Sequence, residues 1–186
     1  MERIAAASPN VKARVAGAFY LLTFVTGIFA LLVRNSVGAA AGLVAGACYI
    51  AVTLLFYDLF KPVDKTISLL AAIVSFVGIV VGPLGITRVN PLVFFGCYCL
   101  LIGYLIFRST FLPKALGVLM ALASLGWLTF LWPPLAKALY PYNMAPGIIG
   151  EGALTLWLLA VGVNVPKWQA GLTPPAPSSV RSSAGL

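Results

Sequence analysis

The chain consists of apolar runs of roughly 20 residues, separated by short gaps that carry its charges. A helix needs about 20 mostly apolar residues to cross the hydrocarbon core of a bilayer. Six runs approach that length, and we expect each to form one span, over about 15–33, 37–60, 66–82, 91–107, 114–132 and 146–165. The sequence therefore predicts an all-α fold, a polytopic transmembrane bundle of six helices.

The composition excludes a water-soluble domain. Hydrophobic residues make up 61%, charged residues 9%, and the mean hydropathy is +1.04, whereas soluble domains carry about a quarter charged residues. The net charge of +8 is spread over the span ends and is not gathered into a basic patch with polar surroundings. We therefore expect the lipid bilayer, with its anionic headgroups, as the partner of these charges, and no nucleic acid.

The basic residues predict the orientation of the bundle. Lys and Arg near span ends are retained on the cytoplasmic side of a membrane. When the gaps are assigned alternately to two sides, nine of the twelve fall on one side and three on the other. The nine are Arg3, Lys12, Arg14, Lys61, Lys65, Arg108, Lys114, Lys167 and Arg181, and the three are Arg34, Arg88 and Lys137. Both termini are then predicted to be cytoplasmic.

Three regions follow from this pattern. We expect a short cytoplasmic N-terminus over residues 1–11, a membrane domain over 12–168, and a disordered tail rich in Pro and Ser over 169–186. The first apolar run is longer than the core of a signal peptide, so we expect an uncleaved first helix.

Small residues recur at helical spacing along several spans. Helices in lipid associate through close packing of small residues, and the glycines that fit this role are Gly38, Gly42, Gly46, Gly78, Gly82, Gly96 and Gly103. One interpretation is packing between neighbouring helices of one chain. The alternative is that Gly38, Gly42 and Gly46, each four residues apart, form the face of a homo-oligomer.

Two acidic residues lie inside predicted spans. Asp58 lies three residues before Lys61, where a charged helix end is expected. Glu151 lies in the first part of the sixth span. It is either a carboxylate stabilised by a helix N-terminus or a site for a ligand, proton or cation that faces the bundle interior. Arg88 is its expected partner, and Asn90, Tyr98 and Tyr142 complete the predicted polar cluster on the outer side.

Other chemical signatures are missing from the sequence. It has no His, and its three cysteines lie within apolar runs, so we expect neither a metal nor another cofactor. No glycine-rich phosphate loop and no nucleophile–His–acid set is present. Nothing in the sequence gives positive support for an enzyme, and no residue is predicted to be catalytic.

Several segments resemble a known family. They are the opening run 14–22, the turn 60–64, the stretches 94–96, 103–109, 111–114 and 116–119, and the segments 150–152 and 156–159. Together they resemble the bacterial membrane-protein family called domain of unknown function 4386. The resemblance covers nearly all of residues 12–168 and implies a multi-pass protein of the bacterial cytoplasmic (inner) membrane. It includes Arg108, Pro113 and Glu151 in the family pattern and implies no assigned activity.

Three functions remain open at this point. The first is a small helical bundle that binds a lipid, a hydrophobic small molecule or a partner subunit. The second is a small oligomeric transporter or channel with Glu151 on the path. The third is a membrane-embedded enzyme that acts on an isoprenoid or lipid.

Overall fold

The computed structural model describes residues 8–84 and 89–171 of the chain, and every regular element within them is helical. The all-α prediction is confirmed for these residues. The predicted positions of Arg88 and of the tail beyond residue 171 lie outside them. The elements are α2 (Pro9–Leu32), α3 (Ser36–Phe60), α4 (Lys65–Leu84), α5 (Pro91–Arg108), α6 (Lys114–Leu128), η1 (Thr129–Leu131), α7 (Pro133–Leu139), η2 (Tyr142–Met144), α8 (Ala145–Ala160) and α9 (Val165–Ala170).

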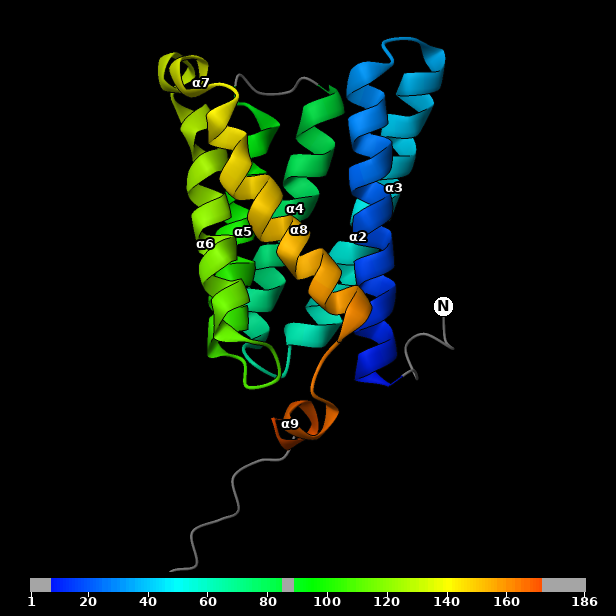
Figure 1. Cartoon of the computed structure of the whole chain (residues 1–186), viewed down its shortest axis with the longest axis vertical. Helices are drawn as coiled ribbons and strands as arrows, with labels where there is room; N and C mark the ends of the chain where they lie inside the picture. Colours follow the sequence, from blue (N-terminus) through cyan, green and yellow to red (C-terminus); the bar gives the residue numbers. More distant parts are fainter. Residues whose placement is uncertain (1–7, 85–88, 172–186) are drawn as a thin grey trace, which may run out of the picture.

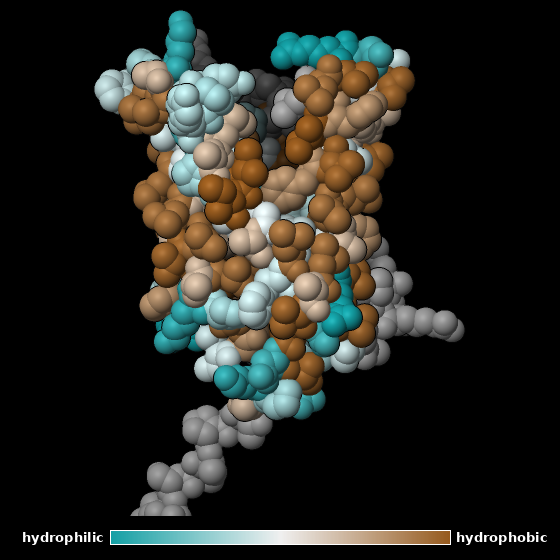
Figure 2. All heavy atoms as spheres, viewed as in Figure 1, coloured by the Kyte–Doolittle hydropathy of each residue, from teal (hydrophilic) through white to brown (hydrophobic). Residues whose placement is uncertain are grey.

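Each of the six predicted segments contains a long helix, and successive long helices run in opposite directions (Figure 1). Four stretches are long and apolar enough to cross a membrane, namely Pro9–Ala30, Ser36–Phe60, Pro91–Arg108 and Lys114–Leu131. The apolar stretch Lys65–Val81 in α4 is shorter, and α8 has 16 residues. The face shown in Figure 2 is mostly apolar between two polar ends, which together with the four stretches indicates a membrane protein.

Local sequence signals set most of the helix starts. The predicted start of α5 is confirmed, because the Asn90 side chain accepts a hydrogen bond from the Leu92 amide and Pro91 occupies the first turn. Ser8 caps α2 and Asn35 caps α3 in the same way. Because of the Ser8 cap, α2 begins at Pro9, so that Lys12 and Arg14 lie within the first helix and not before it.

The last long helix ends earlier than the sequence predicted. We expected the sixth span to continue to Val165, but α8 ends at Ala160. Gly162 adopts φ 77°, a left-handed conformation that ends helices, and its amide donates to the Trp157 carbonyl. A Cβ at this position would lie 1.8 Å from Asn10 Oδ1 of α2, so only glycine fits here.

The two ends of the bundle differ in the number of basic residues that they carry. We call the end that carries the start of α2 and α9 the basic end, because seven of the described basic residues lie there, and we call the other end the opposite end. The seven are Lys12, Arg14, Lys61, Lys65, Arg108, Lys114 and Lys167, while Arg34 and Lys137 lie at the opposite end.

Helix α8 connects the two parts of the bundle. It crosses obliquely from α6 near the opposite end to α2 near the basic end (Figure 1). A Cβ on Gly17 of α2 would lie 3.0 Å from the Leu159 backbone nitrogen, so α2 and α8 are in close contact near the basic end. Because α8 is tilted, α2 and α3 diverge from it toward the opposite end.

Candidate functional site

Glu151 lies in the interior of the bundle and not at its surface. It is the seventh residue of α8 and only 1% exposed. Its Oε2 accepts a hydrogen bond of 2.9 Å from the Tyr20 hydroxyl of α2, and its Oε1 accepts one of 2.7 Å from Trp127 Nε1 of α6. The favourable effect of a helix N-terminus falls off within the first turn. The helix terminus therefore does not account for this carboxylate.

Two glycines allow α6 and α8 to approach so closely. A Cβ on Gly147 would lie 2.4 Å from the Trp127 ring, and a Cβ on Gly150 would lie 2.6 Å from the Leu119 carbonyl oxygen. Both glycines precede Glu151 by about one turn or less on α8. They leave the space in which the Trp127 indole reaches the carboxylate.

Aromatic rings surround this position. Tyr20 lies 6.5 Å from Tyr49, which lies 5.7 Å from Tyr98, measured between ring centroids. Phe95 contacts both Tyr49 and Trp127, at 5.4 and 5.6 Å. The rings thus form a continuous set of contacts from α2 through α3 and α5 to α6. We call Glu151, Thr155 and these five aromatic residues the central cluster.

Several polar atoms of the central cluster have no hydrogen-bond partner among residues 8–84 and 89–171. These are the hydroxyls of Tyr49, Tyr98 and Thr155, all of them buried, with Tyr49 close to Ser75 and Tyr98 close to Thr53. The nearby hydroxyls of Thr53 and Ser75 bond to each other at 2.7 Å. Buried polar groups are normally hydrogen-bonded, and an unpaired one costs about 1–3 kcal/mol. We therefore take the central cluster, with one buried carboxylate and these hydroxyls, as the candidate site.

The space next to the central cluster, toward the opposite end, is open. Seven residues make almost two full turns, so positions seven apart share a helix face. Gly27 lies two turns from Tyr20 and Gly46 two turns from Thr53, and a Cβ on either glycine would meet no atom within 4 Å. Ile148, two turns before the buried Thr155, is 58% exposed. Figure 2 shows the surface hollowed between the upper parts of α8 and α2.

Of the other predicted members of the polar cluster that the structure describes, Tyr98 lies in the central cluster, and Asn90 and Tyr142 lie elsewhere. Asn90 caps α5 and lines a separate cavity of about 860 Å³ at the opposite end, beside Lys137 and Tyr140. Tyr142 is 81% exposed. Arg88 lies outside the described residues, so its pairing with Glu151 stays a prediction. Among the described residues the carboxylate accepts hydrogen bonds from Tyr20 and Trp127, which the sequence did not single out.

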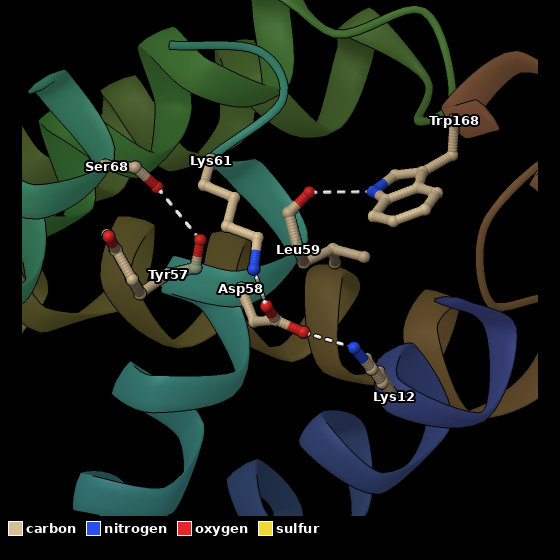
Figure 3. Close-up of polar contacts among 7 residues, drawn as sticks. All are labelled: Lys12, Tyr57, Asp58, Leu59, Lys61, Ser68 and Trp168. Atoms are coloured by element: carbon tan, nitrogen blue, oxygen red, sulfur yellow. Dashed lines mark hydrogen bonds and ion pairs between the residues drawn. The ribbon is translucent and has the colours of Figure 1, made fainter. Parts of the chain in front are cut away.

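Asp58 belongs to the basic end. It forms ion pairs with Lys12 of α2 and with Lys61 after α3 (Figure 3). The Lys61 pair is the arrangement expected for a charge at a helix end. Lys12, 46 residues away in sequence, adds a link between α2 and α3. This acidic group is thus compensated by two cations, whereas no basic side chain among the described residues pairs with Glu151.

The glycines predicted for helix packing fall into two groups. Gly96 and Gly103 of α5 face α6, and Gly78 of α4 faces Phe94 of α5, each with a hypothetical Cβ 2.9–3.0 Å from its neighbour. A Cβ on Gly38 would overlap the Val33 carbonyl. A Cβ on Gly42 would lie 3.7 Å from the Ala30 Cβ, and one on Gly46 would meet no atom within 4 Å. The surroundings of Gly82 are outside the described part. Homo-oligomer formation through the α3 glycines stays a prediction.

Comparison with known proteins agrees with the resemblance inferred from the sequence. Residues 87–162 match the family model described as Domain of unknown function (DUF4386), which confirms the resemblance over these residues. They include Tyr98, Trp127 and Glu151, but not Tyr20. An uncharacterized protein of Archaeoglobus fulgidus is 28% identical over 127 residues, which cover 61% of this chain and 76% of the relative. No solved structure matches the chain.

Proposed function

We propose that the chain is a six-span protein of the cytoplasmic membrane, with its basic end and both termini on the cytoplasmic side, that binds a hydrophobic organic cation next to Glu151. The orientation is supported by the seven basic residues at one end against two at the other. Helix α4, whose apolar stretch is shorter, and α8, which has 16 residues, complete the six spans. Placement in a bacterial inner membrane stays a prediction from the family resemblance.

The observation that carries the ligand class is the environment of Glu151. A carboxylate in a membrane interior is costly unless it is paired. Here neutral donors occupy both oxygens and supply no compensating charge. Aromatic faces attract organic ammonium and related cations, most strongly where water is excluded. A carboxylate lined by Tyr20, Tyr49 and Trp127 therefore favours a ligand that combines one positive charge with apolar groups.

The open space beside the central cluster supports an approach from the opposite end. Gly27 and Gly46, which share helix faces with Tyr20 and Thr53 on the side of the opposite end, are small and uncharged. At the basic end the interior is filled by fully buried side chains such as Phe56, Leu59 and Phe60. A ligand that enters from the opposite end or from the bilayer would therefore stop at the cluster.

Transport is the second candidate, and the chemistry of Tyr20 favours it. Trp127 Nε1 can only donate, but a tyrosine hydroxyl can donate or accept. Glu151 Oε2 can therefore carry a proton without losing its contact with Tyr20, since the direction of that bond then reverses. Exchange of a proton for a cation at one carboxylate is the step that a proton-coupled transporter requires.

The test is the binding of tetraphenylphosphonium to the protein in phosphatidylcholine nanodiscs, with protein-free nanodiscs as background. We expect specific binding that falls at least tenfold in Glu151→Gln, and no specific binding of tetraphenylborate, which has the same shape and the opposite charge. Tyr142→Phe, which alters an exposed tyrosine, is the matched control and should bind normally. Equal binding by wild type and Glu151→Gln would refute the proposed site.

The pH of the same experiment tests a requirement of proton-coupled transport, namely that a proton and the probe compete for Glu151. If a proton and the probe compete for Glu151, binding weakens as the pH is lowered, and probe addition to a weakly buffered sample releases protons. Binding without proton release would leave a binding protein and exclude proton-coupled transport of this probe.

A further inference from the structure

Helix α9 is fixed across the basic end of the bundle. Trp168 Nε1 donates a hydrogen bond of 2.9 Å to the Leu59 carbonyl at the end of α3 (Figure 3). Before α9, the Asn164 amide donates to the Phe111 carbonyl at 3.2 Å, and the Asn164 side chain caps the helix at the Lys167 amide. Three segments that are distant in sequence are thus held together: the α3–α4 turn, the α5–α6 turn and α9.

A small pocket of about 200 Å³ lies between these segments. Its walls are Pro62 and Val63 of the first turn, the segment 108–111 of the second, and Lys167, Trp168 and Gly171 of α9 and its end. The lining thus combines two cations and the hydroxyl residues Ser109 and Thr110 with apolar groups, and it contains no acidic residue.

Neither basic residue of the pocket forms an ion pair among the described residues, although the Arg108 guanidinium lies over the Tyr104 ring. The ion pairs of the described residues involve only Lys12, Asp58 and Lys61, so neither Arg108 nor Lys167 is compensated in this way. Arg108 donates one hydrogen bond, of 2.9 Å, to the Tyr104 hydroxyl, and a guanidinium has five N–H donors. The acidic residue whose charge acts on Arg108 is Asp64, and the Asp64 side chain accepts a hydrogen bond from the Ile67 amide.

An apolar path leads from the pocket along the outside of the bundle. On α5, Leu100, Tyr104 and Phe107 lie at i, i+4 and i+7 and are 47%, 44% and 51% exposed. Positions with this spacing form one stripe on a helix, and Arg108 follows directly at its basic end. The stripe faces outward, where acyl chains lie in a membrane.

We propose that this pocket holds the phosphodiester of an anionic phospholipid, with Arg108 and Lys167 as its ligands and an acyl chain along the α5 stripe. Arginine matches phosphate oxygens with two parallel hydrogen bonds, and lysine adds a point charge. Basic pockets between helices at the cytoplasmic surface are suited to headgroups of this kind. The pocket volume fits a phosphate and its glycerol, and Trp168 provides the amphipathic side chain typical of the membrane interface.

The test is native mass spectrometry of the purified protein in detergent, with equal amounts of phosphatidylglycerol and phosphatidylcholine added. We expect at least fivefold preferential retention of phosphatidylglycerol, and loss of that preference in the double variant Arg108→Gln/Lys167→Gln. The matched control is Arg14→Gln/Lys65→Gln, which removes one arginine and one lysine from exposed positions of the same end but outside the pocket and the α5 stripe, and should keep the preference.

Three outcomes would overturn the proposal. They are equal retention of the two lipids by the wild type, equal loss in both double variants, and displacement of the lipid by millimolar inorganic phosphate, which would indicate a site for the free anion. Circular dichroism in the same detergent checks that the variants are folded. Arg108→Lys, which keeps the charge but not the paired donors, should retain an intermediate preference.

Discussion

The basic end and the central cluster satisfy their polar groups in different ways. At the basic end Asp58 has two lysine partners, Trp168 bonds a carbonyl, and Asn10 bonds the Val163 amide. In the central cluster one carboxylate has only neutral partners, and three hydroxyls have none among the described residues. The first arrangement stabilises a fold. The second keeps unpaired groups where apolar residues would be more stable, which is the cost expected at the proposed binding site.

The largest effect should separate the tight and the open part of a single helix. Gly17→Val in α2 places side-chain atoms against the α8 backbone and should destabilise the protein by about 3 kcal/mol or prevent folding. Gly27→Val on the same helix meets open space and should change stability by less than about 0.5 kcal/mol. Thermal denaturation followed by circular dichroism measures both.

The same pair of variants also tests the proposed ligand site. Gly27→Val should weaken tetraphenylphosphonium binding although the protein stays stable, because the new side chain occupies the space beside the cluster. A destabilised Gly27→Val would show that this space is filled, and the comparison between the two ends would fail.

The second effect concerns the ion pairs at the basic end. Asp58→Ala leaves Lys12, which is 8% exposed, without its partner and should cost about 2 kcal/mol, less than for a fully buried pair because the Asp58 carboxylate is partly exposed. Lys65→Ala, at an exposed position of the same end, is the control and should be near neutral. A melting temperature unchanged by Asp58→Ala would mean that the ion pairs of Asp58 do not stabilise the protein.

The third effect is a difference between two tyrosines in how loss of the hydroxyl changes the free energy of unfolding. Tyr20→Phe removes a hydrogen bond to Glu151 and should destabilise the ligand-free protein by about 1–2 kcal/mol. Tyr98→Phe removes a buried hydroxyl that has no described partner and should leave stability unchanged or raise it by about 1 kcal/mol. Chemical denaturation in detergent gives both values. Equal destabilisation by the two would show that the Tyr98 hydroxyl is bonded.

The smallest effect tests the predicted pairing of Arg88 with Glu151. Both carboxylate oxygens already accept a hydrogen bond, so we expect Arg88→Gln and Glu151→Gln to be additive within about 0.5 kcal/mol in a double-mutant cycle. A coupling energy above about 1 kcal/mol would show that Arg88 and Glu151 form an ion pair. The carboxylate would then have a positive partner within the chain, and the reason for proposing a cationic ligand would be lost.

The sequence predicted the helices well and the site only in part. The span predicted to begin at about residue 91 does begin there, because the cap formed by Asn90 depends on neighbours within three residues. Glu151 was identified because a carboxylate in an apolar run is rare. Its partners were missed, since Tyr20 is 131 residues away and reaches Glu151 only because α8 crosses the bundle.

The sequence by itself determined the helical class, the membrane character and the unequal distribution of basic residues. These properties depend on composition and on spacing along the chain, and they hold whatever the helices pack against. The tertiary structure decided the rest: the close approach of α6 and α8 at Gly147 and Gly150, the end of α8 at Gly162, and the burial of Glu151. These depend on contacts between helices, since α8 packs against both α6 and α2 and Gly162 lies against Asn10 of α2.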